Sequence, residues 1–232
     1  MKNTYDENGY LILKDVIPRV KIDELMQKNL EIVNQVTQKK FLDLNDKNLI
    51  KFYDEHPEIE TKVYEAIQDQ PWITEFTKQK EIIQHVKEIL GEDVGVFGKA
   101  PFRMDMPFWT KDMAHWHQDF FYVKGNTRVV TVWIPMQDTK YIHGCISIMP
   151  KTHHLGILEH NVRVGRKMIP QSIFENEIKL VEVNKGDIVL FSSLLLHSSN
   201  INCSEQIRYS IQPRYTPLNE ESDKGMKGVI PV

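Results

Sequence analysis

The sequence predicts an α+β protein in which strands predominate, with a double-sheet jelly roll or barrel buttressed by N-terminal helices. Apolar residues recur at intervals of three and four in the first part of the chain, as on one face of a helix. From Asp93 onward, short runs rich in Val, Ile, Phe and Tyr alternate with turn sequences, as in a sandwich or barrel. A chain of 232 residues can bury one full core. We therefore expect a single domain over 1–232, with helical support in 1–92, the jelly-roll core in 93–216 and a tail in 217–232.

Three helices are expected in the first part. The segment that begins at Pro18 is amphipathic, and a second helical pattern lies near residues 57–69. A third helix ends at Gly91, because glycine readily adopts the left-handed conformation that closes a helix. The apolar positions of the first helix are Ile22, Leu25, Met26, Leu30, Val33 and Val36, and those of the third are Ile82, Val86, Ile89 and Leu90.

Short β-type runs fill the second part. They read VGVFGKAPFRM, TRVVTVWIPM, CISIM, KLVEV, DIVLFSS and IRYSIQPRY, and turn sequences such as NKGD separate them. The last run alternates apolar with polar residues, so that a strand here has one apolar and one polar face. The polar face either meets solvent or lines a cavity, where an arginine offers a rigid two-donor fork for a carboxylate. The polar residues are Arg208, Ser210, Gln212 and Arg214.

Charge and composition exclude several classes of partner. The net charge is −3 and the lysines are scattered among acids, so we expect no nucleic acid and no anionic membrane as partner. The longest apolar run falls far short of the roughly 18 residues of a membrane span. The two cysteines, Cys145 and Cys203, are too few for a disulfide framework. We expect a cytoplasmic protein that acts on a small molecule.

The segment AHWHQDF carries three possible metal ligands at every second position, His115, His117 and Asp119. In an extended chain all three side chains project to one face. One interpretation pairs His115 with His117, as in cupin-type sites, which need a carboxylate a few residues further on. Phe121 and Tyr122 stand at those positions, so this interpretation lacks a third ligand.

The other interpretation joins His117 and Asp119 with one remote histidine. Such a set is the 2-His-1-carboxylate facial triad of non-haem Fe(II) oxygenases, which leaves three positions for cosubstrate and O2. An isolated His-x-Asp pair is more often ordinary polar surface, so the motif needs support from elsewhere. His197 is favoured because it closes the apolar segment DIVLFSSLLLH. The histidines considered for the remote position are His143, His153, His154, His160 and His197.

An ordered set of segments resembles the phytanoyl-CoA dioxygenase family of Fe(II)- and 2-oxoglutarate-dependent oxygenases. The segments are HQD, VTVWIPMQDTKYIHGCISIMPKTHH, VNKGDIVLFSSLLLHSSN and RYSIQPRY, and they run from about Gly98 to Tyr215. ENGYLILKDVIP near the start is similar to the N-terminal strand of the family. The resemblance implies a double-stranded β-helix, a cupin-like jelly roll, as the core.

The resemblance also implies roles for particular residues. His117, Asp119 and His197 are the expected iron ligands and catalytic centre. Arg208, eleven residues after His197, is expected to bind the far carboxylate of 2-oxoglutarate. Further candidates for the cosubstrate site are Trp133 beside the cosubstrate, Ser199 as a hydrogen-bond donor and Lys99 as a charge in the cavity.

The implied reaction oxidises a C–H bond of a small molecule while 2-oxoglutarate and O2 become succinate and CO2. Related halogenases have a small residue at the carboxylate position, so Asp119 favours hydroxylation, or another oxidation such as desaturation or demethylation. No basic cluster stands out for a coenzyme A diphosphate, and an acyl-CoA substrate is not expected. Two alternatives remain, a cupin-type metalloenzyme without 2-oxoglutarate and a non-catalytic small-molecule-binding relative.

Overall fold

A computed structural model describes residues 1–110, 113–123, 126–163, 166–168, 177–220 and 228–232; the side chains of residues 161–163 and 166–168 are outside this description. The predicted helices are confirmed: α2 follows Pro18, α4 covers the second helical pattern, and α6 ends just before Gly91. Shorter helices that the sequence did not predict lie between them. The helices are α1 (Lys2–Asn8), α2 (Arg19–Thr37), α3 (Lys47–Glu55), α4 (Pro57–Gln68), α5 (Pro71–Thr77), α6 (Lys80–Leu90) and α7 (Phe120–Val123).

Local sequence signals account for the helix starts. Pro57 and Pro71 occupy the first turns of α4 and α5, where a missing N–H costs nothing. The side chain of Asp46 caps α3 by accepting a hydrogen bond from the backbone N–H of Asn48 at 2.8 Å.

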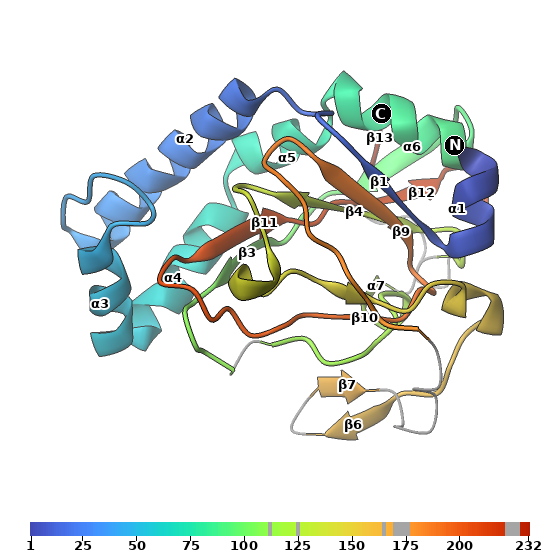
Figure 1. The fold of residues 1–232 in the computed structure, drawn as a ribbon. Coiled ribbons are helices and arrows are strands. Elements are labelled where there is room, and N and C mark those ends of the chain that lie inside the picture. Colours follow the sequence, from blue (N-terminus) through green and yellow to red (C-terminus); the bar gives the residue numbers. More distant parts are fainter. Residues whose placement is uncertain (111–112, 124–125, 164–165, 169–176, 221–227) are drawn as a thin grey trace.

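The main sheet has eight strands, and all its pairs are antiparallel (Figure 1). Its order is β1 (Tyr10–Leu13), β9 (Ile188–Ser192), β4 (Val130–Pro135), β12 (Arg214–Pro217), β2 (Val94–Phe97) and β13 (Val229–Pro231). β11 (Arg208–Ile211) branches from β4 and pairs with β3 (Phe102–Asp105). A small sheet contains β10 (His197–Ser198), β5 (Ser147–Ile148) and β8 (Lys179–Leu180), and a hairpin contains β6 (Asn161–Arg163) and β7 (Arg166–Met168). Two 3-10 helices, η1 (Tyr141–His143) and η2 (Thr152–Leu155), lie in the connections.

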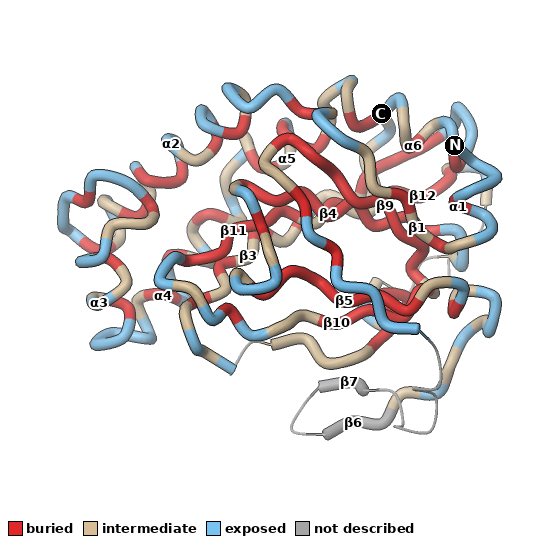
Figure 2. The backbone as a smooth tube through the Cα atoms, in the orientation of Figure 1, coloured by how far each residue is buried: buried red, intermediate tan, exposed pale blue. Residues whose placement is uncertain are grey.

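Two hydrophobic clusters define three layers. The larger one lies between the helices and the main sheet, and it includes Ile22, Val86 and Val132. The second lies between the main and small sheets, and it includes Trp133 and Ile148. Figure 2 shows the central strands β4, β9 and β11 buried and the outer sides of the helices exposed. Because both its faces are covered, every residue of β4 is buried, and β4 shows no alternation of polar and apolar residues.

The jelly-roll prediction with helical support is confirmed, and within the described residues the main sheet does not close into a barrel. Two of the predicted runs, VGVFGKAPFRM and IRYSIQPRY, each divide into two strands. IRYSIQPRY becomes β11 and β12, which are separated at Pro213, a residue without a backbone N–H. β13 lies within the segment expected to be a tail, and β1 within the segment expected to be helical support. In the described part of the chain, no helix is long and apolar enough to cross a membrane.

Candidate metal centre

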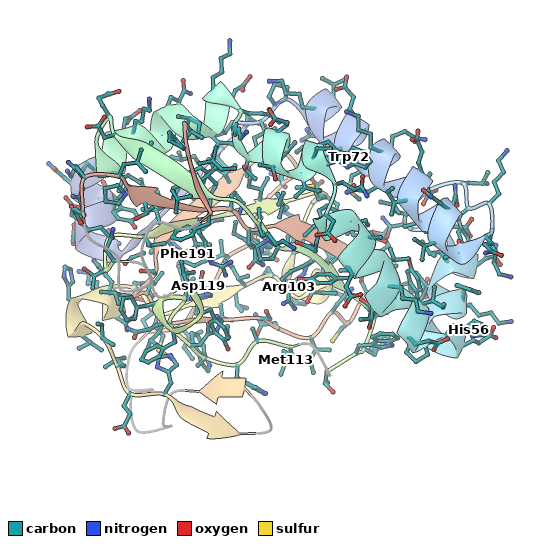
Figure 3. All side chains as sticks on the ribbon, turned by 180° about the vertical axis from the view of Figure 1, so that it is seen from behind. His56, Trp72, Arg103, Met113, Asp119 and Phe191 are labelled. Atoms are coloured by element: carbon teal, nitrogen blue, oxygen red, sulfur yellow. The ribbon has the colours of Figure 1, made fainter. Side chains whose placement is uncertain are left out.

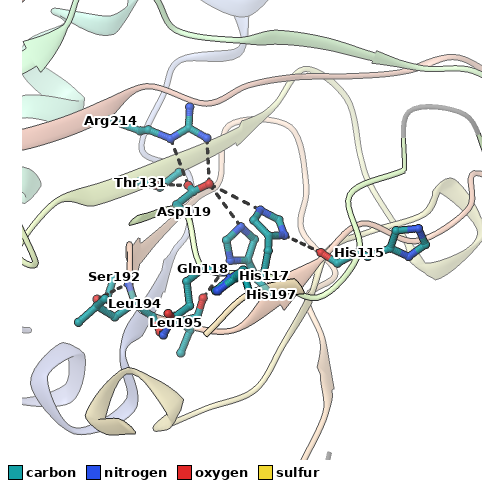
Figure 4. Close-up of polar contacts among 11 residues, drawn as sticks. His115, His117, Gln118, Asp119, Thr131, Ser192, Leu194, Leu195, His197 and Arg214 are labelled. Carbon is teal, nitrogen blue, oxygen red and sulfur yellow. Dashed lines mark hydrogen bonds and ion pairs between the residues drawn. The ribbon is translucent and has the colours of Figure 1, made fainter. Parts of the chain in front are cut away.

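Three buried side chains converge between the two sheets: His117, Asp119 and His197 (Figure 4). Their possible ligand atoms all lie within 4.8 Å of one another. The Oδ1 atom of Asp119 is 3.7 Å from Nε2 of His117 and 3.9 Å from Nε2 of His197. Among the described residues, these three are the histidine and acidic side chains that lie close enough together to hold a metal ion.

The backbone brings the two histidines together although they lie far apart in the sequence. They form an isolated antiparallel bridge, in which His117 N donates to His197 O at 3.0 Å and His197 N donates to His117 O at 3.1 Å. β9 ends at Ser192, so His197 starts the next strand, in the small sheet, rather than ending the apolar strand as expected. Asp119 immediately precedes α7, and its carbonyl accepts a hydrogen bond from Tyr122 N at 2.9 Å.

Backbone carbonyls fix the orientation of both imidazole rings. Nδ1 of His117 lies 2.6 Å from the carbonyl of His115, and Nδ1 of His197 lies 3.0 Å from that of Leu195. A carbonyl oxygen only accepts, so each Nδ1 carries the proton and each Nε2 directs a lone pair toward the centre, as metal-binding histidines do. Burial and the neighbouring His117 lower the pKa of His197 to about 3, so this ring is neutral.

The carboxylate of Asp119 is held from the opposite side. Its Oδ2 accepts hydrogen bonds from Thr131 Oγ1 at 2.6 Å and from Arg214 Nε at 3.2 Å, and its Oδ1 accepts one from Arg214 Nη2 at 3.0 Å. Burial alone would raise the pKa of Asp119, but the charge of Arg214 and the hydrogen bonds hold it well below the usual value. Two imidazole nitrogens and one ionised carboxylate form a donor set that suits Fe(II).

A cavity of about 510 Å³ connects the three converging side chains to helix α4. The cavity is lined by Trp133, Phe191, Ser199 and Arg214, and by residues of α4 such as Tyr64. In Figure 3, Asp119 and Arg103 lie in the middle of the molecule, and His56 lies at the far end of the helical layer.

The predicted cosubstrate residues fall in different places. Trp133 and Ser199 line the cavity, and the Nε1 atom of Trp133 has no hydrogen-bond partner among the described residues. The side chain of Lys99 is 79% exposed and pairs with Asp69 at 3.0 Å, so it lies at the surface and outside the cavity lining.

Arg208 is buried and does not line the cavity. Its Nη2 lies 2.6 Å from Oδ2 of Asp105, and its Nη1 donates to the carbonyl of Gly144. Arg103 binds the other oxygen of Asp105 at 2.8 Å. Burial raises the pKa of Asp105, but the two arginines outweigh it and lower that pKa well below its ordinary value. The Nε atom of Arg208 and the Oγ atom of Ser210 are buried and have no hydrogen-bond partner among the described residues.

The structure leaves the remaining histidine candidates outside the triad. Figure 4 shows the His115 ring turned away from the centre, and the chain bends at Trp116, between the two histidines, instead of running through them as a strand. His153 and His154 stack on each other and contact the backbone of α1, and His143 accepts a hydrogen bond from Lys140 N. His160 contacts the backbone N–H of Gln118.

Three residues at the site, Thr131, Arg214 and Gln118, were not predicted to have a role there. Arg214 belongs to the polar face of the run IRYSIQPRY, and this alternation was the sequence feature that could have indicated a role for it. Its link to Asp119 depends on the register of β12 with β4, in which Arg214 lies opposite Thr131. That register is not visible in the sequence.

Solved structures share this fold over nearly the whole chain. The non-heme monooxygenase ThoJ in its apo form has a TM-score of 0.69 at 16% identity, and the match covers 100% of this chain and 82% of ThoJ. EctD from S. alaskensis, solved with 2-oxoglutarate and 5-hydroxyectoine, has a TM-score of 0.68 at 16% identity, with 96% and 77% covered. These likenesses show the fold of the chain.

The family model for phytanoyl-CoA dioxygenase (PhyH) matches residues 5–210, so the chain belongs to this family. A probable phytanoyl-CoA dioxygenase of Caenorhabditis elegans is 22% identical over 230 residues, covering 91% of this chain and 72% of that protein. The peroxisomal phytanoyl-CoA dioxygenase of Homo sapiens is 24% identical over 219 residues, covering 89% of this chain and 64% of the human protein. Membership makes the protein a 2-oxoglutarate-dependent non-haem iron oxygenase.

Proposed function

We propose that this protein hydroxylates a C–H bond of a small-molecule substrate at an iron centre held by His117, Asp119 and His197. The observation that carries the proposal is the buried triad, whose two Nε2 lone pairs and one ionised carboxylate oxygen face a common point. Bound Fe(II) with 2-oxoglutarate and O2 supplies the oxidising power, and the products of the cosubstrate are succinate and CO2. The residues of the chain fix the ligands and exclude water.

The buried donors of β11 and β4 support a cosubstrate site on the inner face of the main sheet. Arg208 Nε, Ser210 Oγ and Trp133 Nε1 are buried donors without partners among the described residues. Ser210 lies opposite Pro135, two residues from Trp133 on the same face of β4. Unsatisfied buried donors are costly, and an anionic ligand would satisfy them. We propose that the far carboxylate of 2-oxoglutarate binds Arg208 and Ser210, taking over part of the contact that Asp105 makes with Arg208.

The size and charge of the cavity favour a small substrate over an acyl-CoA. A volume of about 510 Å³ is in the range of small-molecule sites. Among the described lining residues, the arginines are Arg103 and Arg214, and each is ion-paired with an aspartate. A coenzyme A diphosphate would therefore find these charges already neutralised. The lining mixes apolar with polar side chains, which suits a compact molecule that carries polar groups.

An anaerobic titration of metal-free protein with Fe(II) and 2-oxoglutarate tests the proposal. We expect the visible charge-transfer band of an iron-bound 2-oxo acid in the wild type, its loss in His197→Ala, and a much higher 2-oxoglutarate requirement in Arg208→Ala. Wild type that binds Fe(II) without the band contradicts the cosubstrate assignment. Wild type that binds no Fe(II) contradicts the metal site.

We also propose that the protein works in the cytoplasm. Cys145 and Cys203 are both free thiols, as is usual in a reducing compartment. Cell fractionation followed by immunodetection tests this location, and recovery of the protein in an organelle fraction contradicts it.

A further inference from the structure

Gln118, the residue between the metal-binding His117 and Asp119, is completely buried, and its side-chain amide is fully engaged. Its Nε2 donates to the carbonyls of Gly156 and Leu194, each at 2.8 Å. Its Oε1 accepts a hydrogen bond from Leu158 N at 2.9 Å. The amide therefore connects the metal-binding segment to two other segments. One contains Gly156 and Leu158, and the other contains Leu194 and continues to His197.

The backbone N–H of Gln118 has a partner of its own. It donates to Nε2 of His160 at 2.9 Å. Nδ1 of His160 lies 2.8 Å from the carbonyl of Leu158, so Nδ1 carries the proton and Nε2 is free to accept. The ring of His160 also stacks on Phe121, with centroids 3.9 Å apart. The tautomer and the orientation of the ring are both fixed by these contacts.

Four hydrogen bonds thus hold one residue between two metal ligands. None of the four touches a ligand side chain. They fix the backbone on both sides of Gln118, from which the side chains of His117 and Asp119 extend. The bond to Leu194, three residues before His197, also fixes the position of this backbone relative to His197. Partners beyond the ligands set ligand geometry, and their loss typically lowers metal affinity about 10- to 100-fold.

We propose that Gln118 and His160 are positioning residues, which hold the three ligands at the spacing that binds a metal ion. The inference rests on the proposed function, because it takes the triad as the metal site. It assigns to His160 the part of a hydrogen-bond acceptor rather than that of a ligand or an acid–base group.

The test measures metal binding without turnover. Metal-free protein is titrated with Co(II), whose visible absorption reports the coordination geometry. His160→Phe keeps the ring that stacks on Phe121 but removes the acceptor, and His160→Gln keeps an acceptor oxygen near the position of Nε2. His56→Phe is the matched control, because His56 lies at the far end of the helical layer and stacks on Phe52.

We expect His160→Phe to raise the Co(II) dissociation constant about tenfold and to alter the absorption bands. His160→Gln should stay within about threefold of wild type, and the control should match wild type. A folded His160→Phe variant with wild-type affinity and spectrum overturns the inference, whatever its melting temperature. If that variant does not fold, Gln118→Met is tested instead, because it removes three of the four bonds. The same rise in the Co(II) dissociation constant is expected, and wild-type affinity and spectrum in a folded Gln118→Met variant overturn the inference. Wild type that binds no Co(II) overturns the proposed function and this inference with it.

Discussion

Arg214 donates hydrogen bonds to both carboxylate oxygens of Asp119, from Nε at 3.2 Å and from Nη2 at 3.0 Å. A metal ion at the triad would share this carboxylate with a fixed positive charge. Thr131 also holds Oδ2 at 2.6 Å, so the orientation of the carboxylate does not depend on Arg214 alone. The arginine therefore moderates the affinity of the site for cations.

We predict that Arg214→Gln binds Fe(II) or Co(II) about tenfold more tightly than wild type. At roughly 5 Å and an effective dielectric constant near 20, the repulsion removed is about 3 kcal/mol, and a tenfold change requires about 1.4 kcal/mol. Without metal, the variant should be less stable by about 3 kcal/mol, because the buried carboxylate loses its charged partner. Metal titration and urea unfolding measure the two effects. An unchanged or weaker metal affinity would contradict the electrostatic role.

The two histidines of His-x-His should differ sharply. His115→Ala should bind Fe(II) like wild type, because the ring of His115 lies outside the triad. His117→Ala should lose at least about 100-fold in affinity, since it removes one of three protein ligands. Equilibrium titration of both variants under anaerobic conditions checks this. Loss of binding in His115→Ala would restore the cupin-type alternative.

Trp133→Phe should weaken 2-oxoglutarate binding about fivefold and leave the metal affinity unchanged. Trp133 lines the cavity, its indole N–H has no partner among the described residues, and one hydrogen bond contributes about 1 kcal/mol. Lys99→Met is the control, because Lys99 is a surface residue paired with Asp69. Titration of the iron-loaded variants with 2-oxoglutarate gives both affinities. If the affinity for 2-oxoglutarate fell in Lys99→Met and not in Trp133→Phe, Lys99 rather than Trp133 would belong to the cosubstrate site.

Asp105 should contribute stability that acid removes. Its pKa in the folded protein lies below the ordinary value of 3.8, so the unfolded chain binds more protons as the pH falls through that value. The contribution of Asp105 is therefore present at neutral pH and is lost as the pH falls below about 5. We expect Asp105→Asn to be less stable than wild type at pH 7 and to lose less stability between about pH 5 and pH 2. Denaturant unfolding over this range is the measurement, and parallel pH profiles would show that Asp105 is not responsible.

Helix α2 offers a test of the helical layer. Ile22 is completely buried, whereas Val20, two residues earlier, is 60% exposed. Ile22→Ala should lower the free energy of unfolding by about 2 to 5 kcal/mol through the cavity that it leaves. Val20→Ala should change it by no more than about 0.5 kcal/mol. Equal effects in thermal or urea unfolding would mean that α2 does not pack as described.

Periodicity alone was enough to predict the long helices and the β-rich second part. It could not divide IRYSIQPRY at Pro213 or separate His197 from the strand before it, because strand ends depend on which sheet each segment joins. Pairing of β13 with β2 is likewise a tertiary effect, which a short apolar stretch near the chain end does not reveal.

The expected iron ligands were located by motif and order, and the structure brings them together. The groups that hold the ligands were not foreseen. Arg214 reaches Asp119 through strand register, and His160 reaches Gln118 through a connection between strands. The neighbours of Arg208 in the structure, Asp105 and Gly144, lie on segments distant in sequence. Such contacts follow from the fold and leave no local signature in the chain.

The bridge between His117 and His197 also bears on how the protein is made. A ribosome-bound chain that has not yet reached His197 carries two of the three ligands, and the backbone partner of His117 does not yet exist. The complete set of three ligands therefore exists only after His197 has been added, and Arg214, which holds Asp119, is added later still.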